Sequence, residues 1–244
     1  MEGDYNHPAD FDGVAYFQRD NFERLNIKFP KSSELLSRIS NDFLQGCLIP
    51  YRKVQAEQNI VFEEGLLNEI VKHDVYELPL DLHREIMEYS WNLFAYKAID
   101  ENKIYIFECS FIQNPITISM IKSNAHEEYT KSFIRNLAHI IEKLKPTLIY
   151  IDQKDIEYSF TKVIEERPQE WFDGFTEYYT KQGFGHANGY SGVDGTIRVL
   201  NARKTLEKSI YDSLSMKKYW IDNSAFSMED VTVAIYSILN IISN

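Results

Sequence analysis

A carboxylate that directly follows an apolar run is the strongest candidate for chemistry in this sequence. Glu108 comes after Ile104-Tyr105-Ile106-Phe107, a continuous apolar run typical of a strand buried on both faces. Parallel sheets bind ligands in the crevice at the carboxyl ends of their strands, so a carboxylate there is expected to face a ligand. The alternative role for Glu108 is a structural ion pair with a neighbouring Lys or Arg.

Cations surround a glycine-rich stretch in the second half of the chain. Residues 169–196 combine glycines with aromatic residues, a composition that predicts a mobile loop or lid. Phosphoryl-transfer enzymes use cations to neutralise the transferred group, an arginine finger being worth roughly 10³–10⁵ in rate. Each cation alone is more often an ordinary surface charge. The candidates for phosphate contact are Arg167, Lys181, His186, Arg198 and Arg203.

Amide and aromatic side chains are candidates for binding a substrate. Gln113 and Asn114 precede a proline and are expected to begin a helix, so their amides either recognise an acceptor or cap that helix. Tyr179 and its neighbour Tyr178 offer rings on which a base can stack, although filling the core is the commoner role of such rings.

A metal site is not predicted. His7, Asp10 and Asp12 have side chains that bind metals, but their spacing brings no further ligands with it.

The elements that must position these residues alternate between short apolar runs and helical periods. Apolar residues recur every three or four positions over 127–145 and again over 156–164, which predicts two helices. Residues 148–151 and 219–221 are expected to be buried strands, and a capping box at Ser227 predicts a final helix. In the first hundred residues, helical periodicity marks 32–45 and 81–99.

Composition favours one α/β domain of the intracellular type. The chain has 244 residues, 44% of them apolar, and no stretch resembling a linker. The net charge of −11 argues against nucleic acid, whereas a small anionic ligand stays possible through local donors. With two cysteines, an acidic N-terminus and no run of about 20 apolar residues, we expect a reduced cytoplasmic protein that is not in a membrane.

Several segments resemble thymidylate-kinase-like P-loop kinases. Residues 146–151, followed by an amphipathic helix that ends in Glu165-Glu166-Arg167-Pro168, resemble their fourth strand, its helix and the entrance of the lid. Residues 218–223 resemble the fifth strand. Residues 2–10, 106–115 and 182–185 are similar to an uncharacterised bacterial family of P-loop proteins, in which a strand and a phosphate loop precede the segment that corresponds to Glu2.

This resemblance implies a three-layer fold with a mostly parallel sheet between helices. The family binds ATP and Mg²⁺ through the pattern G-x-x-x-x-G-K-[ST], which this sequence does not contain, so we expect no tightly bound cofactor here. The first strand of such a fold lies between the strands that correspond to 104–108 and 148–151. Without it those two strands either pair directly or flank a gap, and unpaired buried amides cost roughly 1–3 kcal/mol each.

The resemblance also assigns roles to individual residues. Glu2 and Asp4 correspond to the place where related kinases hold the carboxylate that takes the acceptor hydroxyl's proton, and the alternative is a frayed, charged terminus. Glu108 resembles the first residue of a Glu-Arg-Ser motif, with Cys109 in place of the Arg. The loop from Asp4 to His7 would hold the acceptor.

Two functions follow as expectations. The first is a small-molecule or nucleoside-type kinase that is inactive without its phosphate loop, and the second is a non-catalytic module that keeps the ligand pocket. A hydrolase built on paired carboxylates ranks last because the chain has no nucleophile motif. A small-molecule substrate is expected, and the sequence leaves the oligomeric state open.

Overall fold

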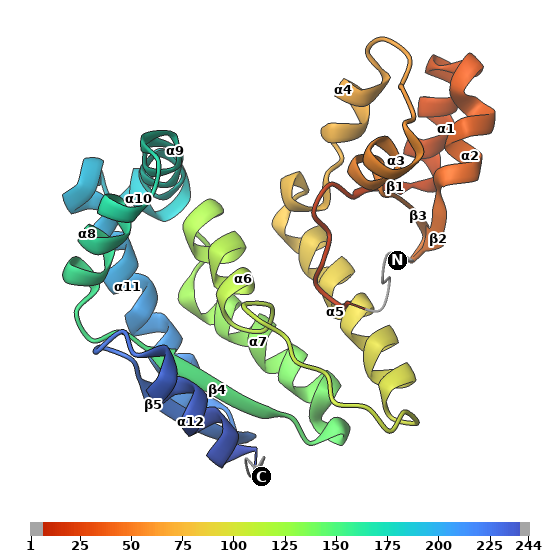
Figure 1. Cartoon of the computed structure of the whole chain (residues 1–244). Coiled ribbons are helices and arrows are strands. Elements are labelled where there is room, and N and C mark those ends of the chain that lie inside the picture. Colours follow the sequence, from red (N-terminus) through yellow and green to blue (C-terminus); the bar gives the residue numbers. More distant parts are fainter. Residues whose placement is uncertain (1–6, 240–244) are drawn as a thin grey trace. The chain divides into compact units, whose positions relative to one another are not determined.

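The computed structural model describes residues 7–239 and divides into two compact units, Met1–Lys97 and Ala98–Asn244 (Figure 1). Each unit has its own sheet. The single domain expected from the sequence stays a prediction, since two compact units can belong to one folding domain.

The first unit contains a three-stranded antiparallel sheet with β3 in its centre. β1 (Ala15–Gln18) pairs with β3 (Gly46–Ile49) on one side, and β2 (Asn41–Phe43) pairs with β3 on the other. A Cβ on Gly46 would lie 2.0 Å from the backbone oxygen of Phe17 on β1, so only glycine lets these strands come this close.

Helices around this sheet complete the first unit. The predicted helix over 81–99 is confirmed by α5 (Leu80–Ala98), whereas the helix expected over 32–45 ends at Ile39 because the chain then enters β2. The core of the unit includes Phe17, Leu36 and Leu66. The remaining helical elements are α1 (Arg19–Lys28), η1 (Pro30–Ser32), α2 (Ser33–Ile39), α3 (Tyr51–Gln58), α4 (Leu66–Val71) and η2 (Val75–Glu77).

The second unit contains two parallel strands that run side by side (Figure 1). β4 (Thr147–Asp152) and β5 (Lys217–Asp222) pair residue by residue along their whole length, which confirms the strands expected at 148–151 and 219–221. The chain is thus an α/β protein. The expected three-layer kinase-like fold is not confirmed. The described part of this unit has a sheet of only these two strands.

The strand expected at 104–108 is a wrong prediction. Residues 101–107 form neither helix nor strand, and the side chains of Ile104 and Ile106 are 87% and 84% exposed. An apolar run becomes a strand only when a neighbouring strand takes up its backbone hydrogen bonds. No such neighbour lies beside this run among the described residues, so the choice between direct pairing with β4 and a gap does not arise here.

The mobile loop expected over 169–196 is also a wrong prediction, since this stretch is mostly helical, while its role as a lid stays a prediction. Trp171, Phe175 and Tyr179 recur every four residues and stack in turn, with ring centroids 4.9 and 4.3 Å apart. Gly183 serves close packing, because a Cβ there would lie 2.0 Å from the backbone oxygen of Ile121. The helices of the stretch are α9 (Gln169–Thr180), α10 (Gly183–Ala187) and α11 (Gly192–Ser213).

The rest of the second unit follows the predicted order. The helix expected over 127–145 is α7 (Glu127–Ile141) with a short extension, η4 (Glu142–Leu144), and it buries Phe133, Ile134 and Leu137. Ser227 caps the last helix by accepting the Asp230 N–H at 3.2 Å, as its capping box predicts. The other elements are α6 (Gln113–Ile116), a π-helical turn η3 (Thr117–Lys122), α8 (Ile156–Glu166) and α12 (Met228–Ile238).

Within residues 7–239, none of the helices combines the length and the apolar character that crossing a membrane requires.

Two glycines give a first test of the packing. We expect Gly46→Ala to lower the free energy of unfolding by roughly 1–3 kcal/mol, because the new methyl group collides with backbone that has no room to move. Gly174→Ala is the matched control, since a Cβ at that position of helix α9 would have no other atom within 4 Å. The control should gain up to about 1 kcal/mol from helix propensity.

Urea denaturation of both variants measures these changes. Equal stability of Gly46→Ala and the parent chain would show that β1 and β3 are not packed as described.

Candidate functional site

A buried chain of polar groups links α11 to β4 and α9. The Tyr150 hydroxyl donates to Glu207 Oε2 at 2.5 Å, and Arg203 Nε donates to Glu207 Oε1 at 2.8 Å. Arg203 also donates to the Tyr179 hydroxyl at 2.7 Å. Arg203 and Glu207 lie four residues apart on one face of the helix, so one turn of α11 supplies both charges.

Burial sets the electrostatics of this cluster. The side chains of Arg203 and Glu207 are only 9% and 13% exposed, so each charge depends on the other for compensation. Burial, followed by the charge of Glu207, raises the pKa of Tyr150 well above its usual range. Tyr150 therefore stays a neutral hydrogen-bond donor to Glu207 at any physiological pH.

The candidate base Glu108 lies in a bend after the irregular residues 101–107 instead of at a strand end. Burial raises the pKa of the neighbouring Cys109 thiol, and the charges of Glu108, Arg203 and Glu207 all act on it. The Glu108 side chain is exposed, while its carbonyl accepts the Ser110 hydroxyl at 2.8 Å. The Cys109 thiol, next to this exposed carboxylate in the sequence, is thus within electrostatic reach of the buried ion pair.

A second polar group lies at the carboxyl ends of the two parallel strands. Lys204 of α11 pairs with Asp152, the last residue of β4, at 2.8 Å. Lys154 pairs with Asp222, the last residue of β5, and Ser224 donates its hydroxyl to the same carboxylate at 2.6 Å. The hydrogen bond from Lys154, followed by those from Ser224, lowers the pKa of Asp222.

Two amide oxygens at this carboxyl edge are buried without a hydrogen-bond partner. They are Gln153 Oε1 and Asn223 Oδ1, each in the residue that directly follows its strand. Native structures leave few buried polar atoms unpaired, and such an atom often marks the place of a water or a ligand. Open sheets bind ligands at this edge.

The predicted phosphate contacts do not form one group. Arg203 points into the interior and is bound by Tyr179 and Glu207. Arg167 stands over the Trp171 ring and Arg198 over the Tyr190 ring, at 5.9 and 5.7 Å from the centroids. His186 and Lys181 are exposed.

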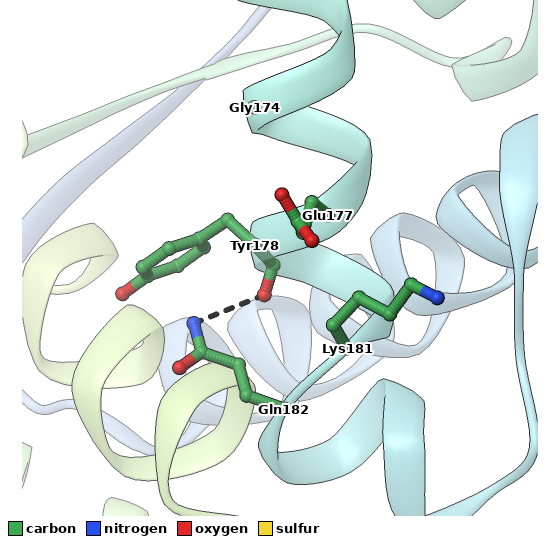
Figure 2. Close-up of a pocket in the computed structure, with 5 residues that line it drawn as sticks. All are labelled: Gly174, Glu177, Tyr178, Lys181 and Gln182. Atoms are coloured by element: carbon green, nitrogen blue, oxygen red, sulfur yellow. Dashed lines mark hydrogen bonds between the residues drawn. The ribbon is translucent and has the colours of Figure 1, made fainter.

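Lys181 lines a shallow depression on α9, shown in Figure 2. The depression measures about 400 Å³ and is wide open to solvent. The carboxylate of Glu177 and the ammonium group of Lys181 point apart in Figure 2, and Gln182 donates its amide N–H to the Tyr178 carbonyl at 3.1 Å. Gly174 completes the lining. This hollow does not enclose a ligand.

The other predicted residues divide between the two units. His7 accepts the Ala9 N–H at 3.2 Å in a turn of the first unit, so a pocket shared by His7 and Glu108 stays a prediction. Glu2 and Asp4 lie outside the described residues. Gln113 is exposed and Asn114 half-buried at the start of α6, and no side-chain hydrogen bond caps that short helix.

No group of three or more metal-binding side chains occurs in the part of the chain that the structure describes.

Most residues of the two polar clusters are missing from the sequence prediction, among them Glu207, Asp152 and Asp222. The sequence contains two signals that point to them. The pair Arg203 and Glu207 has the i, i+4 spacing of a helical ion pair. Asp152 and Asp222 each follow an apolar strand, the same pattern that singled out Glu108.

Comparison with protein-family models, with curated proteins and with solved structures finds no match to this chain. The candidate site therefore rests on the geometry alone.

The buried ion pair gives a stability test. We expect Arg203→Leu to lower the free energy of unfolding by roughly 3–5 kcal/mol, because it leaves Glu207 charged and uncompensated in the interior. The matched control is Arg198→Leu on the exposed face of the same helix, which should lower stability by no more than about 1 kcal/mol because it loses only an exposed contact with the Tyr190 ring.

The double substitution Arg203→Leu with Glu207→Leu should be more stable than the single Arg203→Leu, since it removes both charges together. Guanidinium denaturation of the parent chain, the single variant and the double variant measures their free energies of unfolding. A double variant less stable than the single one would refute the compensation argument.

Proposed function

We propose that these 244 residues form a kinase-related domain that binds a small, uncharged, hydroxyl-bearing molecule and does not itself transfer a phosphoryl group. The fold expectation comes from the resemblance of residues 146–168 and 218–223 to P-loop kinases. The lack of a phosphate-loop pattern in the chain supports the non-catalytic part of the proposal.

The observation that carries the proposal is that the lysines at the carboxyl ends of β4 and β5 are neutralised by carboxylates. Both lysines at this edge are already paired with carboxylates, Lys204 with Asp152 and Lys154 with Asp222. A triphosphate needs uncommitted cations or a cradle of backbone N–H groups, and these two lysines leave no positive charge in excess. An uncharged ligand avoids that requirement.

The unpartnered amide oxygens indicate what such a ligand must offer. Asn223 Oδ1 and Gln153 Oε1 accept hydrogen bonds, so the ligand should carry O–H or N–H donors. Sugars and nucleosides have both a neutral charge and several hydroxyl groups. We therefore place the ligand class among uncharged polyhydroxyl compounds of that kind.

A second candidate, active phosphoryl transfer, is favoured by one observation. Glu108 is exposed, and an exposed carboxylate can accept a proton from a bound hydroxyl. In that reaction the hydroxyl oxygen would bond to the γ-phosphorus of ATP, its proton would pass to Glu108 and ADP would leave. Glu2 and Asp4 are the other proposed bases, and ATP with Mg²⁺ would be the co-reactants.

Ligand binding can be tested on the purified chain with a panel of uncharged nucleosides and monosaccharides. We expect at least one to raise the melting temperature, and Asn223→Leu to weaken that binding about tenfold by removing an acceptor worth about 1.4 kcal/mol. The unliganded Asn223→Leu protein should be as stable as its parent or more stable, since it loses an unsatisfied oxygen.

Asn201→Leu is the control, because Asn201 is exposed on α11 and bonds only within its own helix. No shift with any compound of the panel would contradict the binding proposal. Phosphorylation of a compound of the panel by the 244-residue chain in the presence of ATP and Mg²⁺ would instead establish the second candidate.

A further inference from the structure

Residues 223–226, here named the strap, lead from the end of β5 past the end of β4. Asn223 donates its backbone N–H to the Asp152 carbonyl at 2.8 Å, so the strap begins beside the last residue of β4. The Ser224 hydroxyl then accepts the Lys154 N–H, from the loop that follows β4, at 3.0 Å. The strap therefore joins the two loops at the carboxyl edge of the sheet.

One aromatic side chain, Phe226, holds the far end of the strap on α8. Its ring centroid lies 5.7 Å from that of Tyr158, edge to face, and 4.6 Å from Lys162 Nζ. Tyr158 and Lys162 are four residues apart, so they share one face of α8. Tyr158 is 58% exposed, and such contacts are weak at the protein surface. Ser224 and Ala225, between the two ends, are exposed.

The closed position of the strap is unfavourable at two of its residues. Phe226 has a φ of +55°, in the left-handed region that a bulky side chain rarely adopts. Asn223 Oδ1 is buried without a hydrogen-bond partner, which costs free energy that solvation would recover. Opening the strap would relax the Phe226 backbone and let water reach Asn223. Only the surface contacts of Phe226 and two hydrogen bonds oppose this opening.

The strap also lies at the site proposed for a ligand. Gln153 follows β4 as Asn223 follows β5, and both carry an unpaired amide oxygen. Segments of low local stability are the ones that proteins use to admit and enclose ligands. A ligand that donates a hydrogen bond to Asn223 removes one of the two unfavourable features, so it stabilises the closed strap.

We propose that the strap opens as a unit about Asn223, and that Phe226 is the latch that holds it closed on α8. The open strap gives a ligand access to the two amide oxygens, and the bound ligand favours closure. The control of ligand entry rests on the proposed function, whereas the opening itself does not.

Two backbone amides report on the opening without any ligand. The Phe226 N–H donates to the Asn223 carbonyl at 2.9 Å, and the Lys154 N–H donates to the Ser224 hydroxyl, so both bonds break when the strap opens. Hydrogen exchange measured by NMR should give these amides protection factors within about threefold of each other. The Asn223 amide, at the fixed end, should be protected at least about tenfold more strongly.

Removal of the latch tests the role of Phe226. Phe226→Ala should lower the protection factors of the amides at 226 and 154 about tenfold, because it loses both contacts with α8. The protection of the Asn223 amide and of the interior of α7 should not change. Alanine keeps a Cβ, so the left-handed backbone at this position stays as unfavourable as before.

A second variant removes only the cation above the latch. Lys162→Met should lower the two protection factors about threefold. Lys208→Met is the matched control, because Lys208 also stands over a ring, that of Trp220 at 5.6 Å. Each of the two lysines also pairs with a carboxylate four residues further on, so the variants differ only in the ring that loses its cation. The control should leave the strap amides unchanged.

Three results would overturn the proposal. The first is unrelated protection of the Phe226 and Lys154 amides, and the second is an equal effect of Lys162→Met and Lys208→Met. The third is a Phe226→Ala chain in which the interior of α7 loses as much protection as the strap, since that is a general loss of stability.

Failure of the proposed function is seen in a different measurement. If no compound of the panel raises the melting temperature while the exchange follows the expected pattern, ligand binding is refuted and the strap opening stands. If a compound binds but the strap amides do not respond to Phe226→Ala, the strap is refuted and ligand binding stands.

Discussion

The ion pair between Arg203 and Glu207 is the interaction on which the second unit depends. Both charges lie in the interior, where neither is stable without the other. Through Tyr150 the pair fixes α11 to β4, and through Tyr179 it fixes α11 to α9. One buried ion pair thus satisfies polar groups from β4 and α9 with a single turn of α11.

The carboxyl edge of the sheet shows how charge pairing restricts function. β4 and β5 each end in an aspartate that forms an ion pair with a lysine. The edge therefore has polar atoms without a surplus of positive charge. A site of this kind is suited to recognising hydroxyl and amino groups, and it differs from the cation-rich cradles that hold polyphosphates. The absence of a phosphate-loop pattern from the chain points the same way.

The sequence predicted those elements whose local pattern, a helix period or a cap, agrees with the way they pack in the folded chain. The stripe of α7 buries Phe133 and Leu137, and the capping box at Ser227 begins α12, because helix periods and caps act over a few residues. Prediction failed at Ile104 and Ile106, which have strand composition but no adjacent strand among the described residues. It failed again over 169–196, where glycines indicated a loop. Gly183 is needed there for close backbone contact, a reason that cannot be seen from composition.

By itself the sequence determined the α/β class and the places of β4, β5, α7 and α12. It also determined that no phosphate-loop pattern is present. The roles of Glu108 and Tyr179 stay predictions. Only the tertiary structure decided that Arg203 is a buried structural charge instead of a lid cation, and that Asn223 carries an unpaired oxygen at the sheet edge. The physical reason is that burial and partnership arise between residues far apart in the chain. Tyr150 and Glu207, separated by 57 positions, meet only when β4 packs against α11.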